Sequence, residues 1–217
     1  YTKMKEDYML DYPVERTVRR NGNVEHSTLM EYAEFGNSFY LKSGYTYKPS
    51  DTGTVFTPYN GTRATYYGVS DFIIDSYEHG RIAKMGTKDG LKRSYIWGYK
   101  NEYPIREITD NVYHSDVLQA ITGKAHIREF TYAPQVGMTS ETTPTNLRLL
   151  YGYDTMGRLA SNAFSIVGMK KGITTERYSY NESGNDNYVK TETILDAYDN
   201  NHTTSITYYD GLNRPVE

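Results

Sequence analysis

The chain has no cysteine, one tryptophan and little excess of either charge. Its 217 residues include 24 basic and 27 acidic side chains, for a net charge of −3. The lack of Cys excludes disulfides, thiol catalysis and Cys-based zinc sites. The charge balance gives no electrostatic footprint for nucleic acid or an anionic membrane. No apolar run approaches the ~18 residues of a membrane-spanning helix, and Tyr1–Asp7 is not a signal peptide, so any export signal is expected outside this chain.

Aliphatic residues are also scarce. Leu, Ile, Val and Phe together supply 40 residues, about 18% of the chain, which is just under the ~20% below which disorder is common. Disorder also requires few aromatic residues and a high net charge, whereas this chain contains 24 Tyr and is 14% aromatic. We therefore expect a folded chain in which Tyr replaces much of the aliphatic core. Together with 25 Thr, this composition favours strands over helices.

A short motif, with Tyr before a polar turn, recurs in the second half of the chain. It occupies residues 151–159 (YGYDTMGRL), 178–185 (YSYNESGN) and 208–215 (YYDGLNRP). The second Tyr recurs after 27 and then 29 residues, so the period is irregular. The motif positions are Tyr153, Asp154, Gly157, Arg158, Leu159, Tyr180, Asn181, Gly184, Tyr209, Asp210 and Arg214. Weaker copies are Tyr32–Asn37, Tyr77–Ile82 and Tyr198–His202, the last keeping only the Tyr-Asp front half.

The motif spacing predicts a hairpin turn. An Asp or Asn after the last strand residue accepts hydrogen bonds from nearby backbone N–H groups, and a Gly or Asn four residues after the Tyr tolerates positive φ. The flanking residues alternate as a strand requires, which puts Tyr153 and Tyr180 at strand ends. Further strands are expected over residues 64–69, 71–75, 81–85, 94–99 and 104–108, and one short helix near 116–122 with Gly123 as its stop.

These residues resemble the bacterial RHS or YD-repeat family, whose diagnostic unit is Tyr-Asp-x-x-Gly-Arg-Leu. Residues 153–159 match it in full, while Tyr209, Asp210 and Arg214 match it with Asn213 in the Gly position. Segments 94–105 and 136–140 also look like stretches that recur in large proteins of this family. The resemblance covers roughly residues 64–217 and is loose over the first 60 residues. We therefore divide the chain into a Tyr-rich β region, 1–60, and a repeat region, 61–217.

The resemblance implies a mainly β fold of consecutive antiparallel hairpins in an extended curved sheet. In this family the sheet forms a hollow shell around a variable carboxy-terminal segment, often a toxin, in exported or surface-associated proteins. The motif residues would then be structural. The chain stops at Pro215-Val-Glu217, directly after a turn, so we expect a fragment of a larger protein. The family's self-cleavage region carries an Asp-Pro step that this sequence lacks, so neither a protease element nor a toxin is expected here.

Other chemistry finds little support in the sequence. The five His, at 26, 79, 114, 126 and 202, have no metal-ligand spacing. Asn181, Ser183, Asn185 and Asn187 faintly resemble a calcium loop but lack its carboxylates, so an ordinary turn is favoured. There is no nucleophile elbow, Walker loop or dinucleotide fingerprint, and no glycosidase pair stands out among the carboxylates. We expect no enzymatic activity and no cofactor.

Two functions therefore remain open. The first is a shell segment whose partners are the rest of its polypeptide and the enclosed carboxy-terminal segment. The second is an exported β module that binds a cell-surface glycan or a protein through exposed Tyr rings. Cross-strand pairing explains the Tyr more simply, and Trp97 is expected to be a core anchor rather than a ligand platform.

Overall fold

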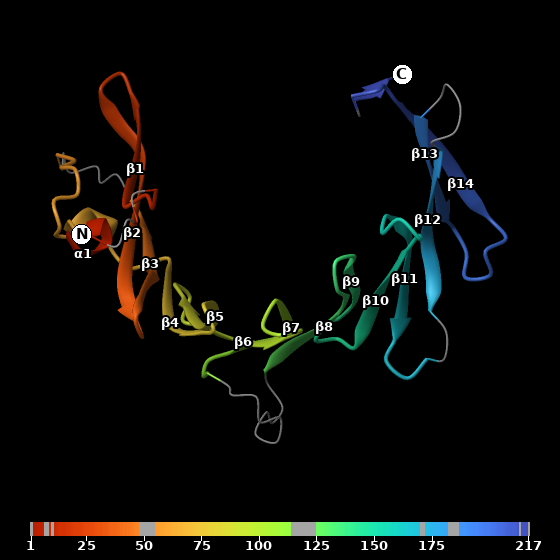
Figure 1. Cartoon of the computed structure of the whole chain (residues 1–217), viewed down its shortest axis with the longest axis horizontal. Helices are drawn as coiled ribbons and strands as arrows, with labels where there is room; N and C mark the ends of the chain where they lie inside the picture. Colours follow the sequence, from red (N-terminus) through yellow and green to blue (C-terminus); the bar gives the residue numbers. More distant parts are fainter. Residues whose placement is uncertain are drawn as a thin grey trace. The chain divides into compact units, whose positions relative to one another are not determined.

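The chain is almost entirely β in a computed structural model that describes residues 2–6, 9, 11–47, 55–113, 125–169, 172–181, 187–212 and 214–216. Fifteen strands form one open sheet whose strand order follows the chain order (Figure 1), and every strand pairing described is antiparallel. The expected mainly β fold of consecutive hairpins is thereby confirmed. No helix among the described residues has the length and apolar character to cross a membrane.

The strands are β1 (Glu15–Arg20), β2 (Asn23–Phe35), β3 (Ser38–Thr46), β4 (Phe72–Glu78), β5 (Arg81–Thr87), β6 (Lys92–Gly98), β7 (Tyr103–Asp110), β8 (His126–Ala133), β9 (Gly137–Thr142), β10 (Leu147–Tyr153), β11 (Leu159–Ile166), β12 (Ile173–Asn181), β13 (Asn187–Ile194), β14 (His202–Tyr209) and β15 (Pro215–Val216). The helical elements described are α1 (Thr2–Glu6) and one 3₁₀ turn, η1 (Thr65–Tyr67). The short helix expected near 116–122 lies outside the described residues.

The chain divides into two compact units. Unit 1 contains residues Tyr1–Ile96 and Ile108–Ala125, and unit 2 contains Trp97–Glu107 and His126–Glu217. The boundary therefore falls within β6 and β7. The division expected at residue 60 separates a Tyr-rich region from a region of repeats. The two compact units do not test it, so it stays a prediction.

Unit 1 builds a small core where a connecting segment covers the sheet. Leu29, Tyr45, Tyr47 and Tyr67 are buried together there. The Tyr67 hydroxyl donates to Glu15 Oε1 at 2.5 Å and shares a 2.8 Å hydrogen bond with Ser27 Oγ. The strand expected over residues 64–69 is therefore wrong. This stretch turns through η1 because the Tyr67 ring inserts into the core and Gly68 follows at φ 61°.

Unit 2 has even less core, because its strands form a single layer. The side chains of β10 and β12 are half-buried along nearly their whole length, instead of alternating between buried and exposed. Among all described residues only eight hydrophobic side chains are buried. Hydrogen bonds and aromatic pairs must therefore hold neighbouring strands together.

The Tyr rings supply much of this cross-strand contact. Tyr40 and Tyr77 stack with ring centroids 4.5 Å apart, and Tyr103 and Tyr132 stack at 4.7 Å. Such pairs stabilise a sheet by roughly 0.2–1 kcal/mol each. Trp97, expected to be a core anchor, is only half-buried in β6.

Candidate functional site

The repeated motif forms a compact five-residue turn, seen most fully between β10 and β11. Asp154 N donates to the Arg158 carbonyl at 2.9 Å, and Gly157 N donates to the Asp154 carbonyl at 3.0 Å. Asp154 Oδ1 accepts from the backbone N–H groups of Met156 and Arg158, each at 2.9 Å. Gly157 adopts φ 79°, which L side chains rarely adopt. The side chain of Asp154 and the positive φ of Gly157 thus both serve the turn itself.

Arg158 completes this turn through its side chain. Its Nε donates to Asp154 Oδ2 at 2.8 Å, so the carboxylate accepts backbone bonds on one oxygen and the guanidinium on the other. These hydrogen bonds, led by the backbone N–H of Arg158, hold the pKa of Asp154 below its ordinary value.

The same turn closes the hairpin of β14 and β15. Asp210 N donates to the Arg214 carbonyl at 3.0 Å, and Asp210 Oδ1 accepts from Leu212 N at 2.9 Å and Arg214 N at 3.0 Å. Arg214 Nε donates to Asp210 Oδ2 at 2.7 Å. The Asp210 pKa is lowered, again chiefly by the backbone N–H of Arg. The two copies of the motif therefore share four hydrogen bonds, made by the backbone N–H, Oδ1 and Oδ2 of the aspartate.

Two further turns share this backbone pattern with Thr in place of Asp. Thr87 N donates to the Leu91 carbonyl at 2.9 Å, and Thr143 N donates to the Leu147 carbonyl at 2.8 Å. In each turn the Thr hydroxyl donates to the same carbonyl at 3.1 Å. The fourth residue is Gly90 at φ 87° or Asn146 at φ 61°. These turns were not grouped with the motif from the sequence because they lack the Tyr-Asp pair, although Thr-x-x-Gly or Thr-x-x-Asn between strands would have related them to it.

In the half-copy of the motif at Tyr198–His202, the aspartate that caps the turn is not the one that the sequence alignment predicted. Asp196, not Asp199, caps this turn: its Oδ1 accepts from Tyr198 N at 2.9 Å and Asn200 N at 3.0 Å. Asp199 adopts φ 62° and so occupies the position of the motif Gly. The alignment of Tyr198-Asp199 with Tyr153-Asp154 is therefore wrong. A longer loop between β13 and β14 moves the capping carboxylate three residues towards the N-terminus.

Tyrosines at strand ends bind the neighbouring strand through their hydroxyls. Tyr153, the last residue of β10, donates to the Met138 carbonyl on β9 at 2.7 Å. Tyr180, near the end of β12, donates to the Leu159 carbonyl on β11 at 2.8 Å. In unit 1, Tyr77 of β4 donates to the Leu41 carbonyl on β3 at 2.7 Å. We call these three contacts the phenol ties. Each runs from one hairpin to the hairpin before it in the chain.

The ring of each tying Tyr in unit 2 packs on the turn of the preceding hairpin. A Cβ added to Gly137 would lie 2.6 Å from the Tyr153 hydroxyl and 3.0 Å from its Cζ, so glycine is needed there to admit the ring. The Arg158 guanidinium lies 4.2 Å from the centre of the Tyr180 ring, within cation–π range. The motif therefore couples neighbours: Asp154 positions Arg158, and Arg158 packs on the Tyr of the next copy.

Three of the remaining motif positions lie at strand ends. Leu159 opens β11 and supplies the carbonyl for Tyr180. Asn181 ends β12, where it is paired with Tyr188 in the strand register, and Tyr209 ends β14. Gly184 lies outside the described residues, as do Ser183 and Asn185 of the faint calcium pattern.

A polar cluster on β11 and β12 joins a carboxylate, a phenol and an amide. Glu176 Oε2 accepts from the Tyr178 hydroxyl at 2.6 Å and from Asn162 Nδ2 at 2.7 Å. These bonds lower the pKa of Glu176, and the bond to Glu176 raises the pKa of Tyr178 to about 12. At neutral pH the carboxylate is thus ionised and the phenol protonated. The described residues contain no cluster of three or more acidic or His side chains that could hold a metal ion.

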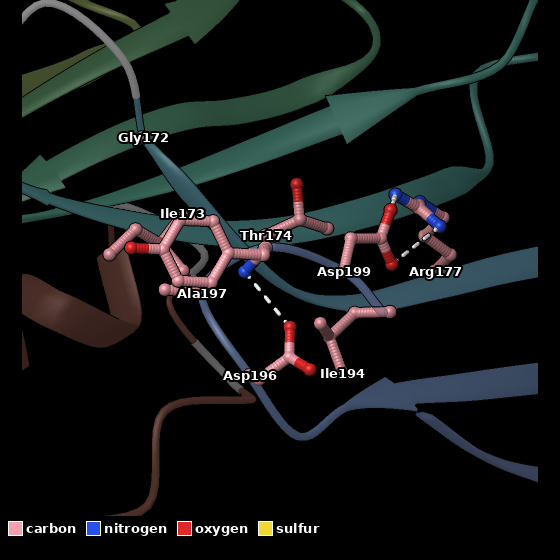
Figure 2. A pocket seen from close by; sticks show the side chains of 9 residues that line it. Gly172, Ile173, Thr174, Arg177, Ile194, Asp196, Ala197 and Asp199 are labelled. Carbon is pink, nitrogen blue, oxygen red and sulfur yellow. Dashed lines mark hydrogen bonds and ion pairs between the residues drawn. The ribbon is translucent and has the colours of Figure 1, made fainter. Parts of the chain in front are cut away.

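A groove of about 460 Å³ lies beside the β13–β14 connection (Figure 2). Ile173, Thr174 and Ile194 line one part of it, and the Asp196–Asp199 turn lines another. Arg177 Nη1 donates to Asp199 Oδ1 at 3.1 Å at its side. The Tyr198 ring is 85% exposed here.

No protein-family model and no curated protein matches the chain. Among solved structures it is similar to crystal structures of TcdB2-TccC3 without hypervariable C-terminal region, of TcdB2-TccC3-Cdc42 and of TcdB2-TccC3, with TM-scores of 0.49, 0.48 and 0.48 and 8% sequence identity in each case. The matches cover 92%, 88% and 93% of this chain. This chain spans only about a tenth of the length of those chains, at 10%, 10% and 11%.

Proposed function

We propose that the chain is a structural segment of an RHS or YD-repeat shell, which encloses and protects a cargo segment of an exported or surface-associated protein. The observation that carries the proposal is the coupling of successive hairpins. Each phenol tie joins a strand to the hairpin before it, and in the Tyr153–Tyr180 step the Arg of one motif packs on the Tyr of the next. A sheet built this way grows by whole hairpins along the chain.

The single-layer strands suit such a role. A wall needs two accessible faces, one towards solvent and one towards cargo, and most side chains of β10 and β12 are half-buried rather than packed in a core. The polar groups of the turn fix its backbone geometry, since both oxygens of Asp154 are engaged within the turn. The proposal therefore gives the motif residues no catalytic role and requires no cofactor.

Limited proteolysis of the polypeptide in its source cells tests this function. An antibody against this chain should detect a polypeptide much larger than 25 kDa in the exported or surface fraction. Proteinase treatment should leave a segment without the motif intact until urea opens the sheet. Cleavage of every non-repeat segment at the same rate before and after urea would refute enclosure.

The groove supports a second candidate, a glycan-binding module. An aromatic face beside charged hydrogen-bonding groups is a common sugar-binding arrangement, and Tyr198, Arg177 and Asp199 provide it. A glycan array should then give hits that Tyr198→Ala abolishes while Tyr188→Ala, a change at a cross-strand ring pair on β13, retains them. An array without hits would remove this candidate.

A further inference from the structure

A second groove, of about 380 Å³, lies within unit 1 and is distinct from the one beside the β13–β14 connection. Met4 of α1, Val14 and Ala33 form its apolar part, and Tyr59 and Gly61 of the segment before η1 also line it. Met4 is buried, with 8% of its surface exposed, although its helix has only five residues. The volume lies in the range of small-molecule sites, about 300–1,000 Å³. The groove can therefore hold a small molecule with an apolar part.

Lys42 lies at a β-bulge and also lines this groove. In the register of β2 and β3, Glu31 pairs with Ser43 and Tyr32 pairs with Leu41, so Lys42 has no partner across the ladder. Such bulges change the direction of a side chain, and they are over-represented beside active sites. The bulge thus places a half-buried lysine at the wall of an apolar groove, which we call the Lys42 groove.

The Lys42 ammonium has no carboxylate partner in the part of the chain that the structure describes. It lies 5.4 Å from the centre of the Phe35 ring, within cation–π range. Glu31 lines the groove as well, but its Oε2 accepts from the Tyr45 hydroxyl at 3.0 Å and its Oε1 lies 3.7 Å from Arg63 Nη1. The acidic group of the groove is therefore already paired, whereas the basic group keeps an uncompensated charge.

We propose that the Lys42 groove binds a small apolar carboxylate. The ligand carboxylate accepts from the Lys42 ammonium, and its apolar part contacts Met4, Val14 and Ala33. A neutral ligand would leave the charge of Lys42 uncompensated, and a cationic ligand would be repelled by it. The site does not depend on the shell function, because its residues all belong to unit 1 and none is a position of the repeated motif.

The methionine methyl groups report binding directly. The chain contains seven Met, so protein labelled with carbon-13 at these methyl groups gives seven resonances. Octanoate is titrated into the labelled chain at neutral pH. The Met4 resonance, assigned with Met4→Leu, should shift until the groove is saturated. Met156 and Met169, which are 67% and 49% exposed in unit 2, should not shift.

Changes on both sides of the contact test its charge. Octanamide has the same chain without the charge, and Lys42→Met removes the ammonium at similar length. Each should weaken binding at least about tenfold, because a hydrogen bond between charged groups is lost. Lys42→Arg keeps the charge and should retain most of the affinity. The matched control is Lys84→Met on β5, since the Lys84 ammonium also lies over a ring but outside the groove; it should leave the Kd unchanged.

A change of shape tests the groove itself. Ala33→Leu fills the space beside Lys42 and leaves the ammonium in place, so it should abolish the Met4 shift while circular dichroism shows an intact fold. N-acetyl-leucine separates the two sources of an apolar carboxylate. Tighter binding of octanoate assigns the groove to a free acyl carboxylate, and tighter binding of N-acetyl-leucine assigns it to the carboxyl terminus of a peptide.

Two results would overturn the proposal. One is a Met4 resonance that neither probe shifts at millimolar concentration, and the other is equal affinity of octanoate for the wild-type chain and for Lys42→Met. Neither result bears on the shell function, which the proteolysis of the complete polypeptide tests separately.

Discussion

Replacing Tyr180 separates the two functions of a tying tyrosine. Tyr180→Phe keeps the ring on Arg158 but removes the 2.8 Å hydrogen bond to the Leu159 carbonyl. A part-buried neutral hydrogen bond contributes about 1 kcal/mol net, which in a domain of this size lowers Tm by about 2–4 °C. Tyr180→Leu also removes the cation–π contact, which contributes about 0.5–1 kcal/mol, so the total loss should reach about 2 kcal/mol.

Urea unfolding followed by circular dichroism measures both variants, with Tyr198→Phe as the matched control. Tyr198 is 85% exposed, so removing its hydroxyl should leave the free energy of unfolding unchanged within about 0.5 kcal/mol. A double-mutant cycle with Arg158→Ala should find a coupling of about 0.5–1 kcal/mol with the Tyr180 ring. If Tyr180→Phe costs no more than Tyr198→Phe, or if the cycle shows no coupling, the reasoning about the phenol ties is refuted.

Two further predictions concern the turns. Gly137→Ala should destabilise unit 2 in thermal unfolding, because the added Cβ would lie 2.6 Å from the Tyr153 hydroxyl, whereas Gly211→Ala meets nothing within 4 Å and should be close to neutral; equal effects would contradict this packing. Since the folded pKa of Asp154 lies below its ordinary 3.8, the unfolded chain binds the proton more readily, so this contribution to stability is present above about pH 4 and is lost as the pH falls through the lowered pKa. Asp154→Asn should therefore flatten the acid limb of the stability curve, and an unchanged limb would refute the role of this carboxylate.

The sequence predicts the hairpins well where turn chemistry is local. Asp, Gly and the alternating Tyr of residues 151–159 specify a strand, a turn with one positive φ and a second strand, and each of these depends on near neighbours alone. The structure agrees, with Tyr153 closing β10 and Gly157 at φ 79°. The chain-order sheet follows from the same feature, since short turns make consecutive strands neighbours.

Contacts between distant residues could not be predicted in this way. The Ala64–Val69 segment has strand composition, but Tyr67 reaches Glu15 and Ser27, which are far away in sequence. Asp196 takes the capping role from Asp199 because loop length, not the Tyr-Asp pair, decides which carboxylate faces the free N–H groups. The phenol ties likewise depend on strand register, which the repeat spacing of 27 and 29 residues leaves open.

The most direct test of the shell account is a cryo-EM structure of the complete polypeptide that carries this chain, purified from its source. If the chain is a shell segment, residues 126–216 form consecutive hairpins in the wall of a hollow shell, with Tyr153 and Tyr180 bound to the preceding hairpin and a segment without the motif enclosed by the wall. A compact two-sheet sandwich with Greek-key connections, or a wall that surrounds no polypeptide, would contradict it.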